Sequence, residues 1–285
     1  MAPNDPTTAL PTASGERAWK KAFSPLVILG VVLLKAKGLL LPLLKFFPIV
    51  LKTGGTMFLS IGVYAMVWGW KYAAGFVLLI FIHESGHLLA ARSFGLNAGA
   101  PVFIPFMGAF IALKDAPRNA WMEAWVGISG PLAGAWAAGV CHLAGLAYDV
   151  PLLIALAWSG YWLNLFNLTP LGQLDGGRVV TALSPWMWIP GFGIMGYFAI
   201  TRPSLIVWLM LASSIPRLIS LFRKRGAEEQ RYYEVSPRQR AVMATAYFGL
   251  IGILAFAMHL TDLQLHPVRA SHAELSAPSD RPAGS

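Results

Sequence analysis

The chain has 285 residues, of which 56% are hydrophobic and 12% charged, and its mean hydropathy is +0.58. Soluble domains average roughly 45–50% apolar and about 25% charged residues, so the composition excludes an ordinary soluble fold, a disordered chain, a collagen and a coiled coil. The net charge of +9 is gathered in polar stretches between apolar segments, without interleaved aromatic residues, which favours cytoplasmic loops beside a lipid bilayer over a nucleic-acid partner.

The first 52 residues are expected to differ from the rest of the chain. Residues 1–21 are rich in Pro, Thr, Ser and Ala, and we expect a disordered cytoplasmic N-terminus rather than a signal peptide. Residues 22–52 are apolar but are interrupted by prolines and lysines. On a helix, Lys37, Lys45 and Lys52 would fall within roughly 80° of one another. This pattern favours an interfacial or broken membrane helix.

Seven apolar segments follow, and several are close to the ~20 residues that a membrane-spanning helix needs. They cover residues 55–70, 73–94, 122–147, 150–169, 186–200, 203–221 and 241–260. We therefore predict an all-α polytopic membrane protein with about six to eight membrane segments. Its core would span 53–221, followed by a basic cytoplasmic loop at 222–240, an additional membrane helix at 241–260 and a flexible tail at 261–285.

The second of these segments, 73–94, carries an unusual cluster of ionisable residues, His83-Glu84-Ser85-Gly86-His87. A charged side chain at the centre of a membrane helix costs about 2.5 to 3.5 kcal/mol, so a compensating interaction is expected. Residues i and i+4 share one helical face, so His83 and His87 can bind one cation while Glu84 reaches a metal-bound water. The spacing therefore predicts a zinc site with a general base beside it.

A third ligand must come from elsewhere in the chain. Asp115 lies in a polar stretch and reads as a solvated loop acid. Asp175 follows Pro170 and stands among glycines, which permit a close turn beside a membrane helix. We expect Asp175 to be the third ligand, with an ordinary loop acid paired to Arg178 as the alternative.

The HESGH helix and the downstream element N-x-x-P-x-x-x-L-D-G-G, which runs from Asn167 to Gly177, occur in the same order as in a known family. Together with the stretches 101–111 and 127–134, they resemble the site-2 protease family of intramembrane zinc metalloproteases. The resemblance covers about residues 55–185. Many members have Asn where Gly134 stands, and some carry PDZ or CBS modules for which this chain is too short.

The resemblance implies one zinc ion per chain, held by His83, His87 and Asp175, with Glu84 as general base. It also implies that Asn167 and Gly108 position the substrate or the transition state. Residues 101–113 would form a membrane-associated β-hairpin whose edge pairs with an unwound transmembrane protein substrate, a known mode of peptide binding.

The expected function is thus hydrolysis of a peptide bond in or near a transmembrane segment. The alternatives are a non-enzymatic zinc-binding or transport protein, a catalytically silent relative, and a zinc hydrolase of lipid amides. If the source is bacterial, the protein would be a multi-pass protein of the cytoplasmic membrane, with the site nearer the cytoplasmic face because the basic loops gather there. The sequence leaves the oligomeric state open.

Overall fold

The structure is a computed structural model that describes residues 53–106, 108–223 and 226–276, with the side chains described up to residue 265. The two N-terminal predictions, for residues 1–21 and 22–52, lie outside the described residues, as do residues 277–285 of the expected tail. Everything below concerns the unit that begins at Thr53.

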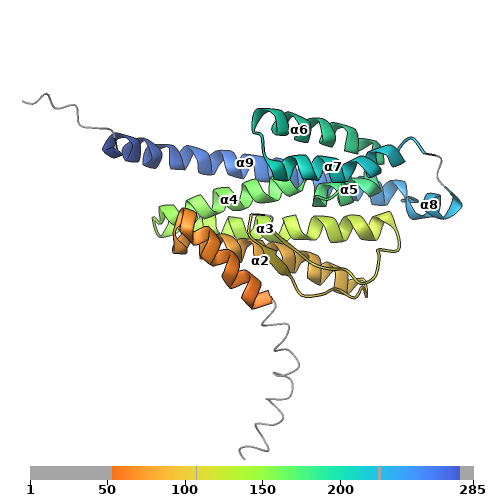
Figure 1. Cartoon of the computed structure of the whole chain (residues 1–285), viewed down its shortest axis with the longest axis horizontal. Coiled ribbons are helices and arrows are strands. Elements are labelled where there is room, and N and C mark those ends of the chain that lie inside the picture. Colours follow the sequence, from red (N-terminus) through yellow and green to blue (C-terminus); the bar gives the residue numbers. More distant parts are fainter. Residues whose placement is uncertain (1–52, 107, 224–225, 277–285) are drawn as a thin grey trace, which may run out of the picture. The chain divides into compact units, whose positions relative to one another are not determined.

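Helices make up most of this unit (Figure 1). Their bounds are Thr53–Trp68, α2 Trp70–Ser93, α3 Ala120–Ala147, α4 Pro151–Asn167, α5 Asp175–Leu183, α6 Trp188–Thr201, α7 Leu205–Ser220, α8 Ala227–Tyr232 and α9 Pro237–Ser276, with a short 3-10 turn at Pro185–Met187. Gly69 separates the first helix from α2 because its positive φ of 78° interrupts the helical path. At the start of α3, Asn119 accepts a hydrogen bond from the backbone N–H of Met122.

Among the described residues, three helices are long and apolar enough to cross a membrane: Trp70–Ser93, Ala120–Ala147 and Pro237–Leu265. The helices Thr53–Trp68 and Leu205–Ser220 are apolar but shorter. The protein is therefore mostly helical with several candidate spans, and the expected six to eight crossings are not confirmed.

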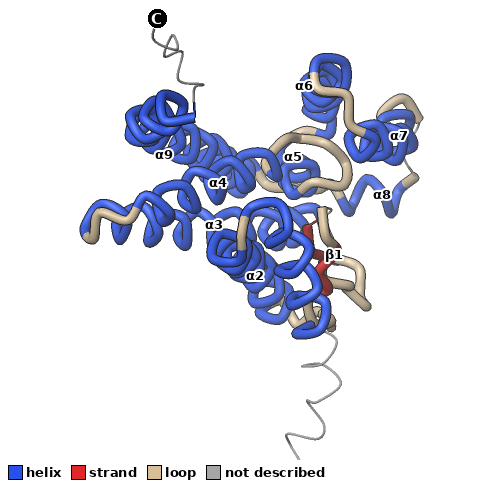
Figure 2. The backbone as a smooth tube through the Cα atoms, turned by 60° about the vertical axis from the view of Figure 1, so that its left-hand side comes forward, coloured by secondary structure: helices blue, strands red, loops and turns tan. Residues whose placement is uncertain are grey.

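Helix α3 is the centre of the packing. It contacts α2, α4 and α5, while α4 contacts α9, so that helices far apart in the chain lie side by side (Figure 1). The largest buried cluster joins α3, α4, α5 and α9 and includes Ile128, Tyr161, Val179 and Tyr247. Helices α6 and α7 pack on each other, away from α2 (Figure 2).

A two-stranded antiparallel sheet interrupts the helical architecture between α2 and α3. Strand β1 (Val102–Ile104) pairs with β2 (Gly108–Phe110), and Phe103 lies opposite Ala109. The predicted hairpin at 101–113 is therefore present. Two hydrogen bonds fix it to the first helix: the N–H of Phe103 donates to the Thr56 hydroxyl, and the N–H of Phe106 donates to the Tyr64 hydroxyl.

Three segments differ from the sequence-based expectations. The region around Asp175, expected to be a turn, forms helix α5, and the expected loop at 222–240 contains α8 and the start of α9. Helix α9 also continues past residue 260 to Ser276, into the expected tail. The loss of hydropathy there ends an apolar span, but Leu, Gln, Ala and Glu still favour a helix.

Candidate metal centre

His83 and His87 lie one turn apart on α2, and both side chains are buried. Their Nε2 atoms are 3.1 Å apart. Space for the second ring depends on α3, because a β-carbon at Gly130 would lie 2.1 Å from Nε2 of His87. The helix α2 therefore presents two imidazoles to the same point, as the i and i+4 spacing predicts.

Asp175 brings the third ligand atom from the first residue of α5. Its Oδ2 lies 3.1 Å from Nε2 of His83, and its Oδ1 lies 3.2 Å from Nε2 of His87. The alternative, in which Asp175 pairs with Arg178, is not seen: no ion pair joins the two within the described residues.

The glycines after Asp175 serve packing rather than the turn that we expected. A β-carbon at Gly176 would lie 2.0 Å from the carbonyl oxygen of Leu168, and one at Gly177 would lie 2.1 Å from that of Leu171. The two glycines thus let the first turn of α5 press against the backbone that leaves α4. This contact brings Asp175 to the histidines.

The second nitrogen of each imidazole has a hydrogen-bond partner. Nδ1 of His87 lies 2.7 Å from the carbonyl oxygen of Val126, and Nδ1 of His83 lies 2.7 Å from Oδ1 of Asn164. A carbonyl oxygen only accepts, so Nδ1 of His87 carries a proton, and in the neutral imidazole Nε2 presents a lone pair. Each ligand is therefore oriented from its far side, as metal-binding histidines commonly are.

The three facing atoms suit a cation. Two imidazole nitrogens and a carboxylate oxygen lie within 4.8 Å of one another in a buried setting. Electron-rich atoms at such separations repel unless a positive charge lies among them. Bonds of roughly 2.0–2.2 Å to zinc at tetrahedral angles put ligand atoms about 3.3 Å apart, close to the observed separations. The donor set of two histidines and one carboxylate fits a zinc ion that keeps an open position.

Glu84 lies next to these ligands on α2, and its side chain is also buried. Its carboxylate makes no hydrogen bond within the described residues. It lines a cavity of about 550 Å³ together with His83, His87, Asp175, Asn167 and Gly108. All six residues predicted for the site therefore border one space.

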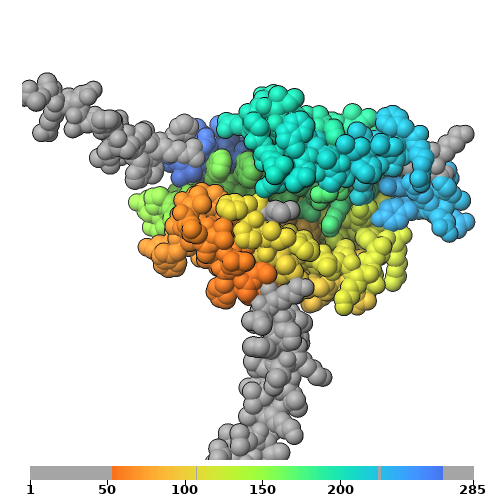
Figure 3. Space-filling model, viewed as in Figure 1, coloured from red at the N-terminus to blue at the C-terminus, as the bar shows by residue number. Residues whose placement is uncertain are grey.

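The cavity has apolar and aromatic walls apart from these groups. The first helix contributes Tyr64 and Trp68, strand β2 contributes Ala109, and α7 contributes Val207 and Met210. In the space-filling view, the yellow hairpin region lies between the orange first helix and the blue-green helices α6 and α7 (Figure 3). Arg178 is the one cation among the lining residues described.

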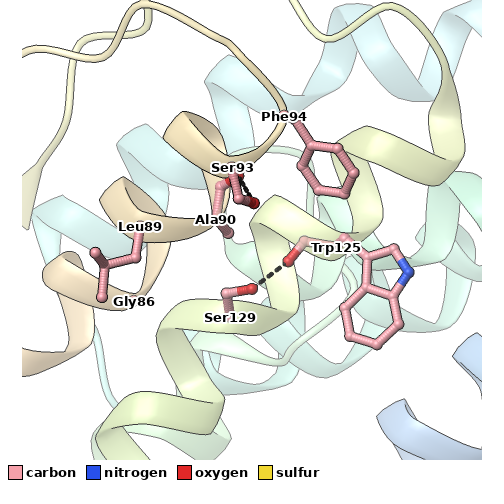
Figure 4. Close-up of a pocket in the computed structure, with 7 residues that line it drawn as sticks. All are labelled: Gly86, Leu89, Ala90, Ser93, Phe94, Trp125 and Ser129. Atoms are coloured by element: carbon pink, nitrogen blue, oxygen red, sulfur yellow. Dashed lines mark hydrogen bonds between the residues drawn. The ribbon is translucent and has the colours of Figure 1, made fainter.

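Other polar candidates lie away from this cavity. Asp115 is partly exposed and accepts hydrogen bonds from the backbone and side chain of Asn97, which lower the pKa of its carboxyl. His142 bonds Gln264 of α9, in keeping with a packed histidine. A second depression between α2 and α3 is lined by Leu89, Ser93, Trp125 and neighbours (Figure 4). Both serine hydroxyls there donate to carbonyls of their own helix, so it offers no chemistry.

Comparison with known proteins adds an independent finding. A model of peptidase family M50 matches residues 71–150, the segment that contains the HESGH motif and α3. This family is the site-2 protease family, and the chain is similar to it over this segment. The resemblance noted in the sequence is thereby confirmed.

Several similar proteins are described as zinc metalloproteases or probable zinc metalloproteases. A zinc metalloprotease of Methanocaldococcus jannaschii is 29% identical over 185 residues, which cover 58% of the chain and 51% of that relative. The probable chloroplastic zinc metalloprotease EGY2 of Oryza sativa is 24% identical over 238 residues, covering 66% and 43%. The EGY2 protein of Arabidopsis thaliana is 28% identical over 155 residues, covering 38% and 27%. The chain thus spans about half of these relatives or less.

Sequence reasoning missed the groups behind the ligands. The carbonyl of Val126 could not be predicted, because every residue carries a backbone carbonyl and the sequence does not distinguish this one. Asn164 does leave a signal in the sequence, because its amide lies within the apolar run of α4, and the residue is 1% exposed in the structure. A carboxamide that is buried within an apolar helix signals a tertiary hydrogen-bond partner.

Proposed function

We propose that this protein is a zinc endopeptidase of the membrane, which hydrolyses a peptide bond in or near a transmembrane segment of another protein. The observation that carries the proposal is the convergence of His83, His87 and Asp175 with Glu84 at one buried cavity. The match of residues 71–150 to a metallopeptidase family supports this choice over zinc transport.

The chemistry follows from the groups at the cavity. His83, His87 and Asp175 would hold the zinc ion, which when bound polarises a carbonyl group and lowers the pKa of water. Within the described residues the Glu84 carboxylate makes no other hydrogen bond, so it can accept a proton from the attacking water. It can then deliver that proton to the leaving amide nitrogen, the two steps of general base and general acid catalysis.

The substrate must reach the site in an extended form, because a helix hides its carbonyl groups in its own hydrogen bonds. In the part of the chain that the structure describes, no further strand pairs with β2, so its outer edge can serve this purpose. The N–H of Phe103 points away from β2 to Thr56, so Phe103 and Ala109 form a non-hydrogen-bonded pair. The N–H and carbonyl of Ala109 therefore face outward on β2, beside the cavity that Ala109 lines. We propose that the substrate backbone pairs there.

The site is proposed to lie near the cytoplasmic face of the membrane. Arg92 stands in the last turn of α2, five residues after His87. At 1.5 Å per residue the ligand is roughly 7 Å along the axis from this charge. A basic residue at a helix end favours the cytoplasmic side. The three candidate spans and the family support an integral membrane protein.

The direct test is Glu84→Gln in protein reconstituted into liposomes with a single-span reporter substrate. We expect zinc content, measured by atomic absorption, to stay at the wild-type level and cleavage to fall by about 10² to 10⁴, the usual contribution of a general base. Asp115→Asn makes the same acid-to-amide change outside the cavity and should leave cleavage intact.

Full cleavage by the Glu84→Gln protein would refute the assigned mechanism. Zinc flux into the same liposomes without any cleavage by the wild-type protein would instead support the transport alternative. Release of fatty acid from lipid amides would assign the zinc chemistry to a different substrate class.

A further inference from the structure

Asn164 connects the metal ligand His83 to helix α4. Its Oδ1 lies 2.7 Å from Nδ1 of His83, and its Nδ2 donates to the carbonyl oxygen of Gly160 at 2.6 Å. The side chain is 1% exposed, so no solvent competes for these bonds. We propose that Asn164 is a positioning residue, which sets the tautomer and ring orientation of His83 for metal binding.

The two hydrogen bonds of Asn164 determine each other's direction. The carbonyl of Gly160 can only accept, so the amide group of Asn164 must face it and the amide oxygen must face His83. Nδ1 of His83 must then carry a proton, which leaves Nε2 with a lone pair toward Asp175 and His87. Asn164 thus selects the one neutral tautomer of His83 that can bind a metal through Nε2.

Helix α3 leaves a space shaped for this carboxamide. A β-carbon at Gly134 would lie 2.2 Å from Oδ1, 2.6 Å from Nδ2 and 2.7 Å from Cγ of Asn164. All three nearest atoms belong to the carboxamide group. Any larger residue at position 134 would therefore push the amide off His83, so Gly134 and Asn164 act as a pair.

This inference rests on the proposed zinc centre, and its expected effect is on metal binding. Groups that orient a metal-binding histidine typically change affinity by 10- to 100-fold when removed. The variant Asn164→Leu keeps the size of the side chain but lacks the acceptor. We expect its zinc affinity, measured by competition with a chromophoric chelator, to fall by that factor. We also expect the visible absorption spectrum of the cobalt-substituted protein to change.

Two further variants separate orientation from packing. Gly134→Ala should lower zinc affinity because its methyl group displaces the carboxamide. The double variant Gly134→Ala with Asn164→Ala removes the clash, so its packing recovers while the acceptor stays absent. We expect its thermal stability to recover relative to Gly134→Ala and its zinc affinity to remain low. Ser159→Ala, which removes a buried hydroxyl from the same helix, is the control and should bind zinc normally.

Wild-type zinc affinity and an unchanged cobalt spectrum in Asn164→Leu would overturn the inference. Recovery of zinc affinity in the double variant would do so as well, because packing alone would then explain the effect. If Asn164→Leu does not fold, the double variant and Gly134→Ala still decide the question. Failure of the wild-type protein to bind zinc would be a distinct outcome, which refutes the proposed function itself.

Discussion

The substitution Gly130→Ala probes how closely α3 approaches the metal ligands. The added methyl carbon would lie 2.1 Å from Nε2 and 2.3 Å from Cε1 of His87, whereas ordinary contacts begin at 3.4 Å. The imidazole must therefore retreat by roughly 1 Å or more, while metal–ligand distances tolerate only about 0.2 Å. We expect His87 to be lost as a ligand.

The loss of one of three ligands should exceed the 10- to 100-fold effect of an orienting group. We therefore expect zinc affinity to fall at least about 100-fold, equivalent to about 3 kcal/mol. The assay is competition with a chromophoric chelator on detergent-solubilised protein, followed by cleavage of the reporter substrate, which should be abolished.

Gly139→Ala is the matched control on the same helix. A β-carbon there meets just the Tyr161 hydroxyl, at 3.8 Å, an ordinary contact. Alanine is favoured over glycine within a helix by roughly 1 kcal/mol, so this control should bind zinc normally and unfold at the same or a higher temperature. Wild-type zinc affinity in Gly130→Ala would show that α3 can move to accept the methyl group. The prediction that close packing of α3 holds His87 in place would then be wrong.

Three other substitutions test separate parts of the structure. Ala109→Pro removes the outward N–H of β2 and should lower kcat/KM about tenfold or more while zinc stays bound. Ala109→Ser keeps this N–H and should keep the activity. Equal kcat/KM values for the two variants would exclude pairing of the substrate at this edge. Arg217→Met removes an ion pair to Glu123 and a contact over the Trp188 ring, and should lower the free energy of unfolding by about 1 kcal/mol, read as a reduced Tm. Arg202→Met, at an exposed position, is its control. Equal Tm values for the two variants would mean that the Arg217 contacts do not stabilise the fold. Tyr64→Phe removes the acceptor for the Phe106 N–H and should slow cleavage with zinc affinity unchanged; a loss of zinc would mean that the hairpin supports the metal centre as well.

Much of the helical architecture could be predicted because apolar runs in a membrane protein follow the helices closely. The segments expected at 73–94 and 122–147 correspond to α2 and α3 within two or three residues. His83 and His87 could be paired because four residues of spacing is a local property of one helix. The prediction of Asp175 as a ligand required more than local spacing, because Asp175 is 92 residues from His83 and no local rule joins the two.

Features that depend on contacts between helices could not be predicted. Asp175-Gly176-Gly177 reads as a loop, yet it opens α5, because the glycines pack on carbonyls of Leu168 and Leu171. The fit of the Asn164 carboxamide against Gly134 likewise depends on two residues together, and these are 30 positions apart in the chain. The hairpin at 101–113 was expected from the family resemblance alone, because three-residue strands carry too little pattern to be recognised.

The separation between the ligands has a consequence for the biogenesis of the protein. Helix α2, with both histidines, is synthesised well before α5, which brings Asp175, and α4 with Asn164 comes between them. A nascent chain that has inserted α2 and α3 therefore has the two imidazoles and Glu84 but lacks the ligand Asp175 that completes the centre. Hydrolytic competence would arise late, after α5 has docked, so an unfinished chain would not cleave its neighbours in the membrane.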